Sequence, residues 1–161
     1  MRLSPRTEGA MRILIFTGVH RDREVRIREI ADAYHMPLEP LEEAHSLLTE
    51  LGLIRPDGSD GEGLRLAVEP DEIRVGWLIR HTEDDLSLVE CFDRAENTCP
   101  ITPACMLRHI FHEARSQFLR TLDGFTVADC LASPRRAHAF VHMWTKASWG
   151  ASGDTDHLDA G

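Results

Sequence analysis

Residues 27–68 read IREIADAYHMPLEPLEEAHSLLTELGLIRPDGSDGEGLRLAV, and this stretch decides the fold of the chain. Its apolar residues recur at helical spacing over 27–34 and again over 41–51, which predicts two helices with a short break between them. Gly52 is placed to end the second helix in a left-handed conformation. Two short apolar runs then flank a turn rich in glycine and aspartate, which predicts a β-hairpin over 53–68. Two helices joined by a tight turn and followed by a hairpin form a winged helix-turn-helix.

Further helices are expected on both sides of this unit. Ser4 followed by Pro5 is typical of a helix start, and that helix should end near the RDRE run at 21–24. A short helix is expected over 75–81 and a long one over 106–122. The long helix places its apolar side chains on one face: Leu107, Ile110, Phe111, Ala114, Phe118 and Leu122. We expect this face to pack against its copy in a homodimer, the alternative being an ordinary core helix. The fold class is mainly α with a small β-hairpin wing and a long dimerisation helix.

Three of the four cysteines fall in one polar stretch, CFDRAENTCPITPAC, residues 91–105. Thiolates bind soft metals, but gaps of seven and five residues differ from the short Cys-x2-Cys pairs of most structural zinc sites. The spacing favours a loop folded around a larger group, such as an iron–sulfur cluster. Two alternatives remain: three ordinary buried cysteines, and a zinc site completed by His109 or His112. Cys130 lies in an apolar helical pattern and is expected in the core or an interface.

Length and composition set the class of protein. A chain of 161 residues is expected to form one domain with appended segments. It shows neither a secretory signal nor a membrane span, so we expect a cytoplasmic protein in which clustered thiols serve metal or redox chemistry. No nucleophile–base pairing, phosphate loop or paired-carboxylate motif stands out, so an enzyme is not expected. We expect a winged helix-turn-helix domain over 1–83, a cluster-binding loop over 84–105, dimerisation helices over 106–133, and a partly disordered tail over 134–161.

Five segments between residue 1 and residue 133 resemble the winged-helix iron–sulfur transcription regulators, the family of NsrR and IscR. They are MRLSPRTEGAMRILI, GLRLA, PDEIRVGWLIRHTEDDLSLVECFD, NTCPITPACMLR and FTVADCL. The resemblance implies a homodimeric, DNA-binding repressor with an iron–sulfur cluster near the dimer interface.

The cysteine spacing is most similar to the nitric-oxide-sensing NsrR branch, which implies a sensor of nitric oxide or redox state. The implied cofactor is a 4Fe-4S cluster, with 2Fe-2S as the other possibility, and the implied ligands are Cys91, Cys99 and Cys105. In that branch a carboxylate from the first helix of the other subunit can hold the fourth iron. The matching residue is Glu8, where the nitric-oxide sensors have an aspartate.

The expected DNA-reading surface departs from this family in its charge. Residues 38–63 carry seven acids against Arg55 alone, a net charge of minus six: Glu39, Glu42, Glu43, Glu50, Asp57, Asp60 and Glu62. Phosphate contacts dominate DNA affinity, so an acidic surface would repel the duplex. The candidate DNA contacts are the arginines Arg2, Arg6, Arg28, Arg55 and Arg65. Two hypotheses follow: a cluster-dependent DNA-binding regulator with a weak operator interface, and an iron–sulfur sensor or scaffold that has lost DNA binding and acts through a basic protein partner.

Overall fold

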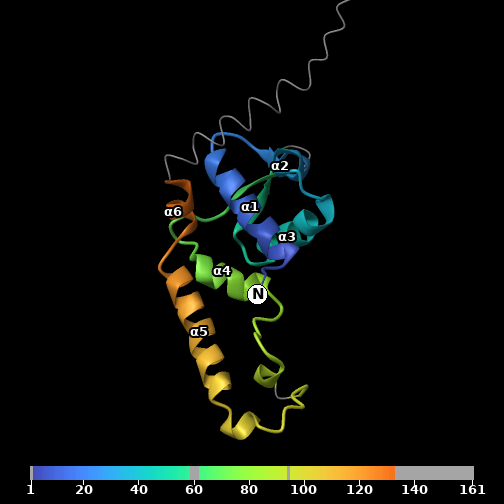
Figure 1. Ribbon diagram of the computed structural model, residues 1–161. Helices are drawn as coiled ribbons and strands as arrows, with labels where there is room; N and C mark the ends of the chain where they lie inside the picture. Colours follow the sequence, from blue (N-terminus) through green and yellow to red (C-terminus); the bar gives the residue numbers. More distant parts are fainter. Residues whose placement is uncertain (1, 59–61, 94, 133–161) are drawn as a thin grey trace, which may run out of the picture.

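The computed structural model describes residues 2–58, 62–93 and 95–132 (Figure 1). A body of helices and a small sheet occupies one end, and a long helix with an adjoining loop extends from it. The fold class expected from the sequence, mainly helical with a small β wing, is confirmed. The tail expected over 134–161 lies outside the described residues.

Three helices build the body. They are α1 (Pro5–Val19), α2 (Ile27–Tyr34) and α3 (Leu38–Glu50), and each was predicted from the sequence. Ser4 caps α1 by accepting a hydrogen bond from the backbone N–H of Thr7 at 3.1 Å. His35 ends α2 at a φ of 50°, and Gly52 follows α3 at a φ of +70°, as expected for a left-handed cap.

A three-stranded antiparallel sheet forms the wing, in the order β1-β3-β2. The expected hairpin supplies β2 (Ile54–Asp57) and β3 (Gly63–Leu66). The third strand, β1 (Val25–Arg26), was not predicted, because two residues carry no periodicity and the strand exists only by pairing with β3. Arg55 lies directly opposite Arg65 in the β2–β3 register.

The core lies where α1 crosses α3 and the sheet closes beneath them. Ile13 and Phe16 of α1 and Leu48 of α3 are all at most 1% exposed, and each contributes about 1.5–3 kcal/mol by burial. A Cβ at Gly9 would lie 3.0 Å from the Pro40 carbonyl oxygen, so this glycine allows the close approach of the two helices. The short helix α6 (Val127–Leu131) packs against α1 and adds Val127 to the core.

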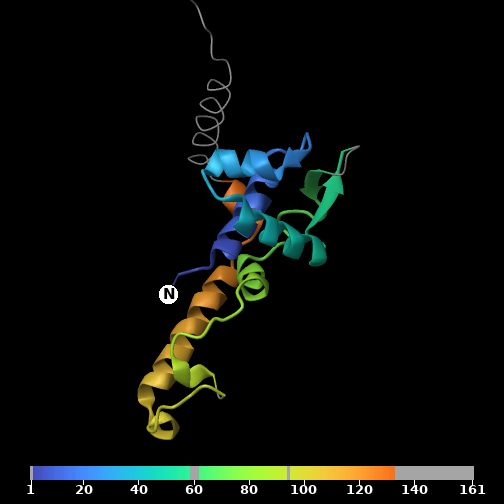
Figure 2. The same ribbon diagram turned by 90° about the vertical axis from the view of Figure 1, so that its right-hand side faces the viewer.

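The extension consists of α4 (Val75–Thr82), the loop that follows it, and α5 (Met106–Asp123), close to the predicted bounds. Arg80 of α4 donates to both carboxylate oxygens of Asp123, at 2.7 and 2.6 Å, and fixes the last turn of α5. From there α5 projects away from the body (Figure 2). None of its residues is buried, so the single chain does not use the apolar face of α5 as core.

Candidate functional site

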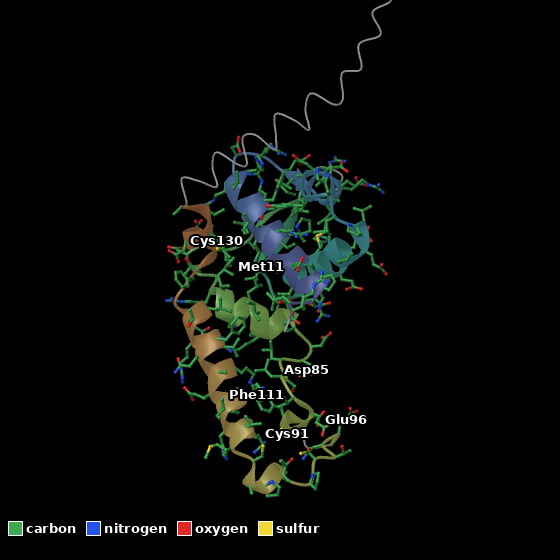
Figure 3. The ribbon with its side chains drawn as sticks, viewed as in Figure 1. Met11, Asp85, Cys91, Glu96, Phe111 and Cys130 are labelled. Carbon is green, nitrogen blue, oxygen red and sulfur yellow. The ribbon has the colours of Figure 1, made fainter. Side chains whose placement is uncertain are left out.

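Residues 84–105, here called the cysteine loop, descend from α4 beside α5 and return to the start of α5. Figure 3 shows Cys91 of this loop at the outer part of α5, whereas Cys130 lies at the opposite end of the molecule on α6. Within the described residues of the loop no side chain is buried. Cys91, Cys99 and Cys105 are all partly exposed free thiols, so they are not core cysteines.

The region around Cys91 is fixed to α5. The guanidinium Nε of Arg108 donates to the Cys91 carbonyl oxygen at 3.1 Å. The neighbouring ring of Phe92 packs edge-on against His112, with centroids 6.1 Å apart, and under the guanidinium of Arg115 at 4.7 Å. These contacts were not predicted, because they join a loop to a helix face seventeen or more residues later in the chain.

Cys99 lies in a tight turn built from polar neighbours. The Asn97 side-chain oxygen accepts from the backbone N–H of Cys99 at 3.1 Å, and the Thr102 hydroxyl donates to the Cys99 carbonyl at 2.8 Å. This turn leads through a 3₁₀ helix, Thr102–Ala104, to Cys105, which immediately precedes α5. The backbone N–H and carbonyl of Cys99 are thus hydrogen-bonded by side chains of the same turn.

Within the described residues, no three His, Cys, Asp or Glu side chains are gathered closely enough to hold a metal ion. The three thiols are therefore not drawn together in this chain, either alone or with His109 or His112. The types of donor nevertheless fit a soft-metal group, since thiolates are the ligands of iron–sulfur clusters. Because the loop has no buried side chain among its described residues, drawing the thiols together would disrupt no core packing.

Glu8 lies in the first turn of α1, where its carboxylate is 3.4 Å from the Arg12 guanidinium. The same turn is tied to the end of α4. Thr7 donates to Thr82 at 2.8 Å in a fully buried contact, and Arg6 donates to the Thr82 carbonyl at 2.7 Å and to Asp84 at 2.6 Å. The first residue of the cysteine loop is therefore bonded directly to the helix that carries Glu8.

The candidate DNA contacts have different surroundings. Arg6 is engaged by Thr82 and Asp84, as described above. Arg65 is hydrogen-bonded to Asp57 and donates to the Arg21 carbonyl at 2.7 Å. Its hydrogen bond holds the pKa of the Asp57 carboxyl below its ordinary value. The other three, Arg2, Arg28 and Arg55, are exposed.

The acidic residues of α3 lie on its outer face. Leu41, Ala44 and Leu48 point into the core, and the exposed positions include Glu39, Glu42, Glu43 and Glu50. Burial lowers the pKa of His45, so this imidazole adds no positive charge to the helix at neutral pH. The negative charge of α3 is therefore exposed, whereas two of the acids counted in the wing are paired, Asp57 with Arg65 and Glu62 with Arg26.

Comparison with known proteins matches the model of the Rrf2 family, described as iron-dependent transcriptional regulators, to residues 3–133. This chain belongs to the Rrf2 family. It is 42% identical over 132 residues to the HTH-type transcriptional regulator NsrR of Geobacillus kaustophilus, covering 81% of this chain and 90% of the relative. It is 34% identical over 136 residues to the HTH-type transcriptional repressor NsrR of Streptomyces coelicolor, covering 83% of this chain and 90% of that one.

The structure of oxidised CymR from Staphylococcus aureus is similar in fold, with a TM-score of 0.65 at 20% identity, over 83% of this chain and 98% of CymR. As an Rrf2 protein, the chain is a transcription regulator, as the resemblance implied, and not an enzyme, as the sequence predicted. None of the helices in the described part of this Rrf2 chain is long and apolar enough to cross a membrane.

Proposed function

We propose that this Rrf2 protein is a homodimeric, DNA-binding repressor in the cytoplasm, whose cysteine loop holds an iron–sulfur cluster of the 4Fe-4S type and senses nitric oxide or redox state. The observation that carries the proposal is the state of Cys91, Cys99 and Cys105. All three are free, partly exposed thiols on a loop without a buried side chain among its described residues. The named NsrR relatives support the regulatory role.

In this proposal the three thiolates bind the cluster, and Glu8 of the second subunit provides a carboxylate ligand. When bound, the cluster supplies an iron without a thiolate ligand, at which a small reactive gas or oxidant can bind. The hydrogen bond from Arg108 to the Cys91 carbonyl positions the first ligand on α5. The bonds of Arg6 to Thr82 and Asp84 connect the start of the loop to α1, and so to the helix-turn-helix packed on α1.

The second subunit is expected to cover α5. Met106, Leu107 and Ile110 are 69%, 59% and 54% exposed, although all three are large apolar residues. Contiguous apolar surface of this kind marks an interface. A pair of such helices from two chains would bury both faces and would bring the two cysteine loops close to the interface.

The cluster is tested by purifying the full chain without oxygen and recording its absorption spectrum, iron and sulfide content. Cys91→Ala, Cys99→Ala and Cys105→Ala should each lose the colour, because each removes one of three thiolate ligands. The matched control, Cys130→Ala, should keep it, because Cys130 lies on α6 at the far end of the molecule. Glu8→Ala should keep the colour but change the spectrum and the rate of reaction with nitric oxide. Full iron and sulfide content in any of the three cysteine variants would remove that residue from the ligand set.

The exposed acids of α3 favour a second candidate function, an iron–sulfur sensor or scaffold that has lost operator binding and recognises a basic protein. Repulsion between these carboxylates and phosphates opposes binding to any duplex. Under this second candidate the protein keeps the cluster and the dimer, and α3 contacts a basic protein instead of DNA.

The two candidates differ in how duplex binding depends on Glu42 and Glu43. Replacing both with Gln should raise duplex affinity roughly tenfold at physiological salt and steepen its salt dependence, because two repulsive charges are removed. Glu39 is left in place, since it lies in the first turn of α3 and stabilises the helix. The charge-matched control is Asp71→Asn with Glu96→Gln, two exposed acids outside α3. Tight operator binding by the wild type that the α3 changes weaken would exclude the scaffold and make the acids base-reading residues.

A further inference from the structure

The first turn of α1 lies beside the end of α4 (Figure 1), and the hydrogen bonds that join them are here called the α1–α4 clamp. The Thr7 hydroxyl donates to the Thr82 hydroxyl at 2.8 Å, and both residues are fully buried. Arg6 donates to the Thr82 carbonyl through Nε at 3.0 Å and through Nη2 at 2.7 Å. The Ser4 backbone N–H donates to the Glu83 carboxylate at 2.7 Å. A buried contact flanked by these bonds fixes how the two helix ends lie against each other.

Two segments with proposed ligand roles begin at this clamp. Asp84, the first residue of the cysteine loop, accepts a hydrogen bond from Arg6 at 2.6 Å. Glu8 directly follows the clamp on α1, and its backbone N–H donates to the Ser4 carbonyl at 3.0 Å. The Glu8 carboxylate is 34% exposed and lies 3.4 Å from the Arg12 guanidinium, which is long for a hydrogen bond. The clamp therefore fixes the Glu8 backbone and leaves its carboxylate accessible from outside the chain.

In a dimer the two sides of the clamp serve different clusters. In the function proposed above, Glu8 is a ligand for the cluster of the other subunit, whereas the cysteine loop binds the cluster of its own subunit. Three thiolates bound to one group would hold the loop in one conformation, and Asp84 would then hold Arg6 in one position. Because the clamp is buried at its centre, a shift on its loop side is passed to the first turn of α1.

We propose that Arg6 and Thr7 couple the two clusters of the dimer, an inference that rests on the function proposed above. A subunit that holds its own cluster keeps its loop and clamp in place and presents Glu8 where the other subunit's cluster needs it. A subunit that has lost its cluster releases its loop, and its Glu8 becomes a poorer ligand. Loss of one cluster therefore promotes loss of the second, and the dimer responds to its signal as a unit.

The test loads the full-length dimer anaerobically with limiting iron and sulfide and counts the clusters per dimer by native mass spectrometry. Independent clusters follow a binomial distribution, in which about half of the dimers hold one cluster at half loading. A coupling of about tenfold, which is within the usual allosteric range, lowers this one-cluster share to about a quarter. The wild type should show the lower share.

Variants of the clamp should raise the one-cluster share toward one half. Thr7→Val removes the buried contact but leaves the Thr82 hydroxyl satisfied, because that hydroxyl donates to the Leu78 carbonyl at 3.0 Å. Arg6→Gln removes the tie to the loop, and Glu8→Ala removes the ligand itself. All three should have the same effect on the distribution.

The control is Arg21→Gln, which removes a different arginine that donates to both oxygens of a carboxylate, that of Glu69, outside the clamp. It should keep the wild-type share. A wild-type share of one half, or a lower share that the clamp variants leave unchanged, would overturn the coupling while the cluster proposal stands. A wild type that takes up no iron and sulfide would instead refute the cluster, and the coupling with it.

A second measurement needs no cluster. In the apo protein, Asp84→Ala removes the loop side of the clamp without touching α1. The backbone N–H of Glu8 should then exchange with solvent about two- to fivefold faster, the range expected for losing a partly exposed ion pair. The Arg21→Gln protein should exchange at the wild-type rate. Unchanged exchange in Asp84→Ala would show that the clamp does not transmit a change in the loop, and would overturn the proposal.

Discussion

Gly76 lies where α4 crosses the end of α5, at a contact too close for any side chain. A Cβ at this position would be 2.2 Å from the Asp123 carboxylate and 2.8 Å from the Asp123 backbone nitrogen. The carboxylate could rotate away only by giving up its bonds to Arg80, and the backbone cannot move without shifting α5. This glycine therefore sets the spacing of the two helices.

Gly76→Ala should lower the free energy of unfolding by about 1–3 kcal/mol, the usual cost of overpacking a close contact. Urea denaturation followed by circular dichroism measures this loss. The control is Gly124→Ala, because Gly124 has a helical φ of −73° and a Cβ there would lie 3.2 Å from one carbonyl oxygen. An equal loss of unfolding free energy in both variants would show that the α4–α5 contact at Gly76 excludes a side chain no more strictly than the surroundings of Gly124.

Individual residues were predictable from the sequence only when their role was local. Gly52 and Ser4 act within their own turns, so their caps could be recognised from neighbouring residues. The ties of Arg6 to Thr82 and Asp84, by contrast, join positions more than seventy residues apart.

At the scale of elements, the pairing of Arg80 with Asp123 joins α4 to α5. The hydrogen bonds from Arg80 hold the pKa of the Asp123 carboxyl below its ordinary value of 3.8. A carboxyl whose pKa is lower in the folded state stabilises the fold above its unfolded pKa, and this contribution is lost as the pH falls through the folded pKa. The joint between the two helices should therefore weaken in acid.

Asp123→Asn should lower the melting temperature at pH 7, where wild-type Asp123 is charged. The difference between the two proteins should shrink as the pH falls below 3.8, because the wild-type carboxyl then takes up a proton as well. Melting curves across this range measure the change. The control, Asp71→Asn, alters an exposed acid that lies outside α4 and α5 and should show a small difference throughout. A constant difference for Asp123→Asn at every pH would show that its charge is not involved.

The helices were predicted well because the spacing of apolar residues along the sequence identifies the buried face of an amphipathic helix. The helices α2, α4 and α5 fall within one residue of the expected bounds, and α3 begins three residues before the expected stretch 41–51. Strand β1 has only two residues and depends on β3 for its existence. The sequence could not predict either that the three loop thiols lie apart in the single chain, since spacing along a loop does not determine where its thiols lie.

For the whole molecule, the exposed apolar face of α5 predicts a dimer. Ile110 belongs to this face and is 54% exposed in the single chain. Ile110→Asp should convert the dimer to a monomer, because two carboxylates would be buried against each other at the symmetric contact. Sedimentation velocity at micromolar concentration distinguishes the two states.

The control for this change is Val19→Asp, which places the same charge on an apolar residue of α1 that is 42% exposed. It should remain dimeric. A wild type that sediments as a monomer, or a dimer unaffected by Ile110→Asp, would exclude α5 as the interface and would leave its apolar face for another partner.

The division of α3 into an inner and an outer face has a consequence for how this regulator can change during evolution. Leu41, Ala44 and Leu48 supply its stability, while Glu42 and Glu43 supply its surface charge. Selection for folding acts on the first set, and selection for a target acts on the second. The charge of the outer face can therefore change without loss of the native state, so related chains can share one architecture while addressing different targets.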